Sequence, residues 1–355
     1  VITLAEPLAT FRSYLTYPMN AIVDPAVVEA NDGSLDSADA GSGPFKLVDW
    51  QRDRHVILEK HNGYHVEGLP KVERLKFRPI ADQTARTTAL RTGELHLVHE
   101  VAPKDAAILE RADGVVVESV PGTFWEYIGL NCQREPFNDV RLRQRVAETV
   151  NREQLNKLVK FDRATVLAGG HIPSNHWAHA GLELYEPKAT VAPRGIELKV
   201  ELIVDASVAY QVRAAEVIKQ QLKPLGIDVT IQGLESAVFF DRLGKGDFQM
   251  TVVGWMGFVD PDEWTWNLFH SDGKYNQQGY ANEKVDALLD EGRRTLDRDK
   301  RKEIYREAQQ IIAEEAPMVF LYVNNQTSAW RENVKGYTVH PTATTLGLRE
   351  TWIEP

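Results

Sequence analysis

Cysteine is almost absent from this sequence. Among 355 residues only Cys132 is a cysteine, so no disulfide can form within the chain and no cysteine-based zinc site exists. No apolar run reaches the ~18 residues that a membrane-spanning helix needs, and no secretory signal is visible. Because Val1-Ile2-Thr3-Leu4 has the pattern of a strand interior and no methionine precedes it, we expect that the natural N-terminus is missing, with any targeting segment.

Several catalytic signatures are also missing. There is no Gly-rich phosphate loop, no dinucleotide-binding glycine motif and no G-x-S-x-G nucleophile elbow. His171, His176 and His179 cluster in the loop 169–180, but spacings of five and three residues match no metal-ligand pattern. We therefore predict no metal and no cofactor.

Charge and composition narrow the class further. A net charge of −10 argues against nucleic acid and anionic membrane surfaces as partners. Hydrophobic content of 43% and charged content of 26% are typical of a soluble globular protein, and the length favours two domains or one with a partial second. The charged run 293–307, with pairs such as Asp297 and Arg301, predicts a solvated helix face.

The clearest periodic pattern lies in the second half of the chain. Apolar residues alternate from Ile196 to Val204, which predicts a strand, and then recur every three or four residues from Val212 to Leu225, which predicts a helix. Gly226 ends that helix, and Ile227–Ile231 predicts a second strand. This β-α-β unit should have parallel strands and a right-handed crossover.

Residues 254–264, GWMGFVDPDEW, follow an apolar run, 248–253, that predicts a buried strand. Two glycines permit a tight path and Pro261 stops further pairing. Aromatic side chains beside carboxylates suit a partly apolar ligand, and ligands bind at the carboxyl ends of strands in open α/β sheets. Two alternatives stay open for Asp260 and Asp262, which either cap the turn or act in hydrolysis.

The order of motifs resembles the family 5 extracellular solute-binding proteins of ABC importers for dipeptides, oligopeptides and nickel. The resemblance covers nearly the whole chain and rests on these segments: Gly41-Ser42-Gly43-Pro44-Phe45 with Trp50, Asn62-Gly63-Tyr64, Gly93-Glu94-Leu95-His96-Leu97, Pro136-Phe137-Asn138-Asp139-Val140-Arg141-Leu142-Arg143-Gln144, Ile172-Pro173, Leu225-Gly226-Ile227, Gly246-Asp247-Phe248-Gln249-Met250, Gly254-Trp255 and Asp260-Pro261-Asp262.

The resemblance implies an α/β, two-lobed periplasmic-binding-protein-like fold with mixed sheets flanked by helices and an extended first lobe. It implies that 1–122 is part of lobe I, that 123–325 forms lobe II and that 326–355 returns to lobe I, with hinges near Gly122 and Asn325. It further implies a periplasmic or extracellular, membrane-anchored monomer without catalysis, which binds a small-molecule or peptide ligand and delivers it to a membrane permease.

The resemblance and the aromatic content together identify candidate ligand-binding residues. The first wall of the site comprises Trp255, Met256, Gly257 and Phe258, with Asp260 or Asp262 as polar anchor. The opposing part comprises Trp125, Tyr127 and Trp177.

Three positions depart from the family pattern. Peptide binders of the family carry an aspartate that pairs with the amine of the peptide, and this chain has Phe258 at that position. They also carry a tryptophan at the position where this chain has Ser236, directly after Glu235. The segment between Tyr185 and Ile196 lacks the family's helix. Two other classes remain as alternatives: a sensory domain of a regulator with the same fold, and a hydrolase that uses Asp260 or Asp262.

Overall fold

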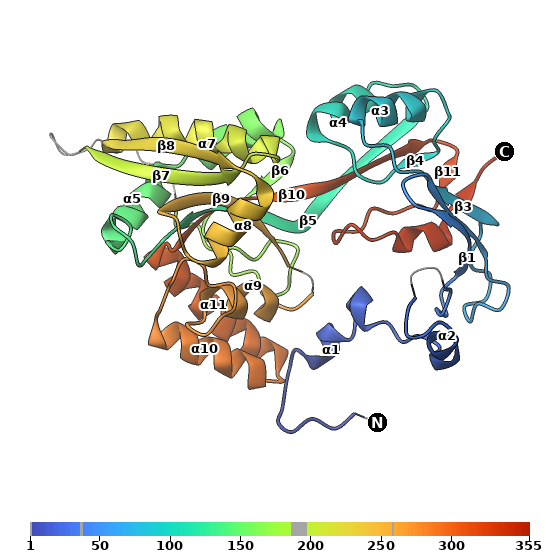
Figure 1. Ribbon diagram of the computed structural model, residues 1–355, viewed down its shortest axis with the longest axis horizontal. Coiled ribbons are helices and arrows are strands. Elements are labelled where there is room, and N and C mark those ends of the chain that lie inside the picture. Colours follow the sequence, from blue (N-terminus) through green and yellow to red (C-terminus); the bar gives the residue numbers. More distant parts are fainter. Residues whose placement is uncertain (1, 36–37, 186–196, 258) are drawn as a thin grey trace. The chain divides into compact units, whose positions relative to one another are not determined.

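A computed structural model describes residues 2–35, 38–185, 197–257 and 259–355. Its contacts form two compact units: unit 1 is Val1–Ser13 with Pro121–Asn325, and unit 2 is Tyr14–Val120 with Gln326–Pro355. Strands β5 (Val115–Leu130) and β10 (Met318–Arg331) pass from one unit into the other (Figure 1). The prediction of one lobe from 1 to 122 differs at its start, because residues 1–13 group with unit 1.

The sheet of unit 1 is mixed, with the strand order β10-β5-β9-β7-β8 and β6 paired to β10. Strand β9 is antiparallel to β5, whereas β7 is parallel to both β8 and β9. The bounds of the remaining strands are β6 Ala164–Val166, β7 Leu198–Asp205, β8 Ile227–Leu234 and β9 Met250–Met256.

The predicted β-α-β unit is present. Helix α7 (Ala209–Leu222) connects β7 to β8, and Gly226 adopts a φ of 73°, which its lack of a Cβ permits. Side chains on the two faces of β7 lie in two different cores, because helices cover both faces of the sheet. Val200, Leu202 and Val204 pack in one core and Ile203 in the other.

Helices cover each face of this sheet (Figure 1). One core contains side chains of α5 and α7, and the other contains side chains of α8 to α11. Asp139 caps α5 as predicted, by accepting from the backbone N–H of Arg141 at 2.9 Å. The other bounds are α5 Val140–Thr149, α6 Arg152–Leu155, a π-helical turn Asn156–Lys160, 3₁₀ turn Lys223–Leu225, α8 Ser236–Gly244, α9 Asp262–Phe269, α10 Glu283–Arg294 and α11 Arg298–Glu315.

Unit 2 contains an antiparallel sheet with the order β1-β2-β3, and the two strands predicted over 45–50 and 55–60 are its first two. Strand β4 pairs with β10, and β11 pairs with β12. The bounds are α1 Phe11–Tyr14 (which begins in unit 1), 3₁₀ turn Pro18–Asn20, α2 Pro25–Ala30, β1 Phe45–Gln51, β2 His55–Lys60, β3 Arg74–Phe77, α3 Gln83–Arg91, β4 Leu97–Val98, α4 Pro103–Leu109, β11 Val334–Lys335, 3₁₀ turn Leu346–Glu350 and β12 Trp352–Ile353.

Two strand predictions need correction. Ile2–Leu4 is not a strand, because these residues have no backbone partner in a sheet. Strand β9 runs to Met256, three residues beyond the predicted end, because β5 pairs with it as far as Phe124 opposite Met256. Gly254 and Trp255 therefore lie within a strand and not in a turn. The segment 186–196 lies outside the described residues.

Candidate functional site

Three strands of unit 1 end at the same edge of the sheet. Because β7 is parallel to β8 and β9, Asp205 and Leu234 end their strands side by side, and β9 runs three residues beyond them to Met256. The Asp205 carboxylate fixes this edge by accepting from the hydroxyls of Ser207 and Ser236, each at 2.7 Å. This edge, here called the carboxyl edge, is where an open α/β sheet presents a ligand site.

The predicted first wall lies at this edge. Trp255 packs against Tyr275 on one face of β9, with the ring centroids 4.9 Å apart. The Met256 side chain points to the other face and is 45% exposed. Met256 is thus an accessible apolar contact at the edge, and Val259, at 46% exposure, is a second one.

Gly257 permits close packing beneath this wall. A Cβ at this position would overlap the indole ring of Trp264, which is completely buried. The Gly257 N–H donates to the Thr123 carbonyl at 3.1 Å, so that the backbone continues along β5 after the strand ends. Phe258, the fourth residue of the predicted wall, lies outside the described residues.

Asp260 is engaged within the protein. Its two carboxylate oxygens accept from the Arg301 guanidinium at 2.7 and 2.9 Å, and both side chains are buried. One oxygen also accepts from the Asp262 N–H at 3.0 Å, which is the turn-capping role that the sequence left open. Arg301 belongs to the charged run predicted as a solvated helix face, and its burial corrects that prediction.

Asp262 has a similar partner. It accepts two hydrogen bonds from Arg293, at 2.8 and 3.0 Å, at the start of α9. Burial raises the pKa of Asp262, although the Arg293 charge acts in the opposite direction. The structure therefore assigns both aspartates to holding residues 260–262 in place, and not to presenting a free carboxylate.

Two of the three aromatic residues predicted for the opposing part are core residues. Trp125 is 0% and Tyr127 1% exposed, within the core beneath α9 to α11. Trp177 is partly buried against the same core, with the Arg298 guanidinium 5.0 Å from its ring centroid. Trp125 and Tyr127 are buried because helices cover both faces of their strand, so these two pack the core and do not line an open wall.

His176 holds the same loop and was not predicted to do so. Its Nδ1 accepts from the Ala178 N–H at 3.1 Å, so Nε2 carries the proton and donates to the Val259 carbonyl at 2.9 Å. Burial lowers the pKa of His176, which favours this neutral form. The histidine-rich loop was the only sequence signal for this contact.

His171 is buried among aromatic rings and holds no ligand-like geometry. Its ring is 5.0 Å from Phe269 and 5.2 Å from Phe320, and burial lowers its pKa to about 3. Across 2–35, 38–185, 197–257 and 259–355, no group of three or more His, Cys, Asp or Glu side chains could hold a metal ion.

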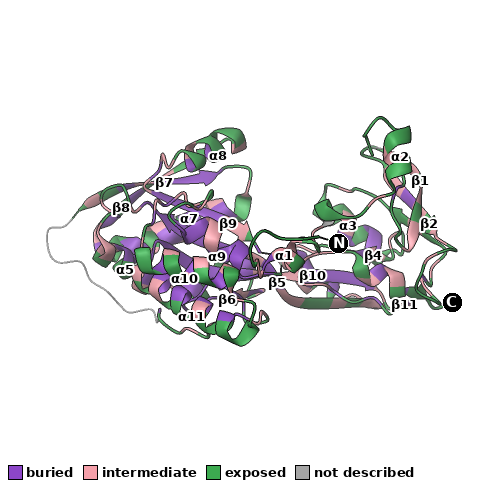
Figure 2. Cartoon of the chain, turned by 90° about the horizontal axis from the view of Figure 1, so that it is seen from below, coloured by how far each residue is buried: buried purple, intermediate pink, exposed green. Residues whose placement is uncertain are grey.

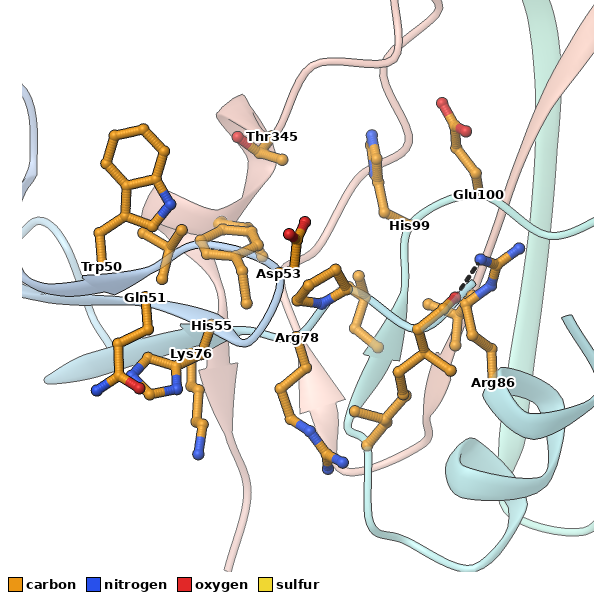
Figure 3. A pocket seen from close by; sticks show the side chains of 18 of the residues that line it. Trp50, Gln51, Asp53, His55, Lys76, Arg78, Arg86, His99, Glu100 and Thr345 are labelled. Carbon is orange, nitrogen blue, oxygen red and sulfur yellow. Dashed lines mark hydrogen bonds between the residues drawn. The ribbon is translucent and has the colours of Figure 1, made fainter. Parts of the chain in front are cut away.

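A separate cavity of about 500 Å³ lies within unit 2, between the β1-β2-β3 sheet and the residues around β4 (Figure 3). Two of its polar side chains have partners within the protein. Arg86 donates to the Ile80 carbonyl at 2.6 Å, and His99 contacts the Tyr337 hydroxyl at 3.1 Å. No predicted site residue lines this cavity, although Trp50, Leu95 and Leu97 of the motifs quoted above do.

In the part of the chain that the structure describes, no helix is long and apolar enough to cross a membrane.

Comparison with known families gives one match that spans most of the chain. The model for bacterial extracellular solute-binding proteins, family 5, matches residues 1–277. Among curated proteins, the glutathione-binding protein GsiB of Escherichia coli O1:K1 / APEC is 28% identical over 358 residues, which cover 96% of this chain and 70% of GsiB.

Solved structures agree with this match. The periplasmic binding protein DppA from Helicobacter pylori, in complex with the peptide STSA, aligns with a TM-score of 0.80 and 25% identity over 99% of this chain and 72% of DppA. AgaA from A. tumefaciens R10, in complex with agropinic acid, aligns with a TM-score of 0.79 and 25% identity over 99% of this chain and 75% of AgaA. The predicted fold class, α/β and two-lobed, is confirmed.

Proposed function

Because this chain belongs to the family 5 bacterial extracellular solute-binding proteins, and is thus the substrate-binding component of an ABC importer, we propose that it captures a peptide-like solute at the carboxyl edge of unit 1. Delivery to a membrane permease follows, without catalysis. The family match disfavours the sensory-domain and hydrolase alternatives. In this proposal the protein acts outside the cytoplasm, in the periplasm or at the outer surface of the membrane.

The observation that carries the proposal is the pair of exposed apolar side chains, Met256 and Val259, at the end of β9 and shortly after it. Met256 and Val259 are nearly half exposed, although His176, Arg293 and Arg301 bind the backbone and carboxylates of the same loop. A surface that presents apolar side chains in a fixed geometry loses little entropy when a solute binds.

Peptide-like chemistry is the narrower part of the proposal. It is supported by DppA, which holds a peptide and is 25% identical. AgaA, at the same identity, holds agropinic acid, so family membership alone does not choose the solute. We propose Trp255, Met256 and the Gly257 backbone as solute contacts, and we retain Phe258 as a contact from the sequence alone.

The test is thermal unfolding of the 355-residue chain with and without trialanine, together with native mass spectrometry of the purified protein. A ligand at 100 times its Kd stabilises the folded state by about 2.7 kcal/mol, which raises the Tm measurably. Met256→Ser should weaken trialanine binding, whereas Leu296→Ser, at a 72% exposed position of unit 1 outside the site, should leave it unchanged. No Tm shift with trialanine, and no peptide in native mass spectra, would reject peptide-like solutes.

A further inference from the structure

A buried ion pair lies close to the carboxyl edge of unit 1. Glu126 of β5 is 0% exposed and Lys160, the last residue of the π-helical turn, is 5% exposed. The Lys160 Nζ donates to Glu126 Oε1 at 2.6 Å. Burial lowers the pKa of Lys160, while the Glu126 charge acts against that shift. Burying two charges is costly, so the pair needs a compensating interaction or a use.

The two hydrogen bonds that the Glu126 carboxylate accepts both go to one oxygen, Oε1. Oε1 also accepts from the Asn324 Nδ2 at 3.0 Å. Oε2 is buried without a hydrogen-bond partner among the described residues, and the same holds for Asn324 Oδ1. Neither oxygen accepts a hydrogen bond, at a cost of about 1–3 kcal/mol each, although the buried Tyr322 hydroxyl interacts with the Glu126 carboxylate. A hydrogen-bond donor that reached them would recover this energy.

The backbone around Lys160 is irregular. The π-helical turn Asn156–Lys160 is followed by Phe161 and Asp162, which have φ values of 57° and 59°. Residues other than glycine rarely adopt this left-handed conformation, and π-helical turns occur frequently at functional sites. The contact between Lys160 and Glu126 therefore forms at a local conformational cost.

Strand register places this pair next to the proposed solute contacts. Phe124 pairs with Met256 and Glu126 pairs with Gly254, so the side chains of Met256 and Glu126 point to the same face of the sheet. They lie two residues apart along the strands, which corresponds to about 7 Å. Gly254 adds no side chain beside Glu126.

The ring of Tyr210, in α7, packs against the Lys160 side of the pair. The Lys160 Nζ is 3.7 Å from the ring centroid of Tyr210, and Tyr210 is 37% exposed. Asn324 is also partly exposed. Rotamer changes of exposed side chains take picoseconds to nanoseconds. A change at Tyr210 would therefore open a path to Glu126 without rearrangement of the sheet.

We propose that Glu126, positioned by Lys160 and covered by Tyr210, is the subsite that binds a primary ammonium group of the solute. This inference rests on the proposed function and names the charged group that the solute carries. The ammonium donates to Glu126 Oε2 and Asn324 Oδ1, while Lys160 stays on Oε1. Glu126 Oε2 and Asn324 Oδ1 are acceptors, so they favour a cationic donor over an anion.

The sequence provides an independent reason for such a subsite. In this chain Phe258 stands where peptide binders of the family are expected to carry an amine-binding aspartate. The aspartates of the same loop, Asp260 and Asp262, are held by Arg301 and Arg293. A solute amine therefore needs another carboxylate, and Glu126 is buried near the same strand end with one oxygen unused.

The test compares binding of trialanine and of N-acetyl-trialanine by isothermal titration calorimetry. The wild type should bind the free amine about 10- to 100-fold more tightly, as expected for a hydrogen bond between charged groups. Glu126→Gln preserves the shape of the side chain but removes its charge, so it should reduce that ratio to about threefold or less. Glu201→Gln is the matched control, because Glu201 pairs with Arg242 at 2.5 Å in the same unit and should retain the wild-type ratio.

A second variant keeps the test independent of folding defects in Glu126→Gln. Tyr210→Ala leaves the ion pair in place and removes its cover, so it should accelerate trialanine association in stopped-flow measurements and preserve the preference for the free amine. An unchanged preference in Glu126→Gln, or equal affinity of the wild type for both peptides, would overturn the subsite alone. If the wild type binds neither peptide, the proposed function fails and the subsite fails with it.

Discussion

The sheet of unit 1 and the three-stranded sheet of unit 2 are buried to very different extents. In unit 1 the last four residues of β7 and the first four of β9 are all buried. In unit 2, β1 and β3 contain no buried residue and β2 contains only Ile57 (Figure 2). Trp50 and Phe77 remain 46% and 37% exposed there.

This difference shows what stabilises each sheet. Burial contributes about 25 cal/mol per Å² of apolar surface, so unit 1 derives its stability from two packed cores. The sheet of unit 2 depends more on backbone hydrogen bonds and on exposed ion pairs, such as Arg78 with Glu94 at 2.7 Å. Equivalent substitutions should therefore cost much more in unit 1 than in this sheet.

The largest contrast is expected between two arginines. Arg301→Met leaves the buried Asp260 charge without its partner, and such losses cost about 3–5 kcal/mol. Arg78→Met breaks an exposed pair with Glu94, which is expected to cost at most about 1 kcal/mol. Urea unfolding, followed by probes in each unit, measures both changes in the free energy of unfolding. Equal costs would show that Asp260 is accessible to water and that residues 260–262 are not held by Arg301.

A contrast of intermediate size concerns pH. The pKa of His171 is about 3 in the folded state, below the value of about 6.5 for an unfolded chain, so its contribution to stability is present above pH 6.5 and is lost as the pH falls towards 3. From pH 6.5 to 4.5 this loss is about 2.3 kcal/mol in the wild type. His171→Phe should remove that part of the pH dependence in urea unfolding. His65→Gln, at an exposed position of unit 2, should retain it.

Local patterns predicted the elements of unit 1 well. The alternation in β7 and the helical spacing in α7 are properties of neighbouring residues, and both elements formed with parallel strands as expected. The same alternation could not show that helices cover both faces of β5. Trp125 is buried by Phe320, a residue almost two hundred positions later in the chain, and the sequence predicted Trp125 as a ligand contact.

The predictions for the aspartates differ from the structure for the same reason. Asp260 and Asp262 were recognised as a pair, but their partners Arg301 and Arg293 lie 41 and 31 residues further along. In the predicted helix, Arg301 lies four residues after Asp297, and this local pair favoured the prediction of a solvated face. Only the packing of the α10 and α11 helices against the loop decides which carboxylate each arginine binds.

The smallest contrast uses two glycines. A Cβ on Gly254 would overlap the Phe124 ring and lie 3.0 Å from the Trp125 carbonyl oxygen, so Gly254→Ala should destabilise unit 1 by about 1–3 kcal/mol. A Cβ on Gly43, before β1, would meet no atom within 4 Å, and its φ is not in the left-handed region. Gly43→Ala should therefore stabilise the protein slightly, by less than about 1 kcal/mol, because it restricts the unfolded chain. Thermal unfolding of both variants measures the difference, and a destabilising Gly43→Ala would show that the start of β1 is packed more tightly than its exposure indicates.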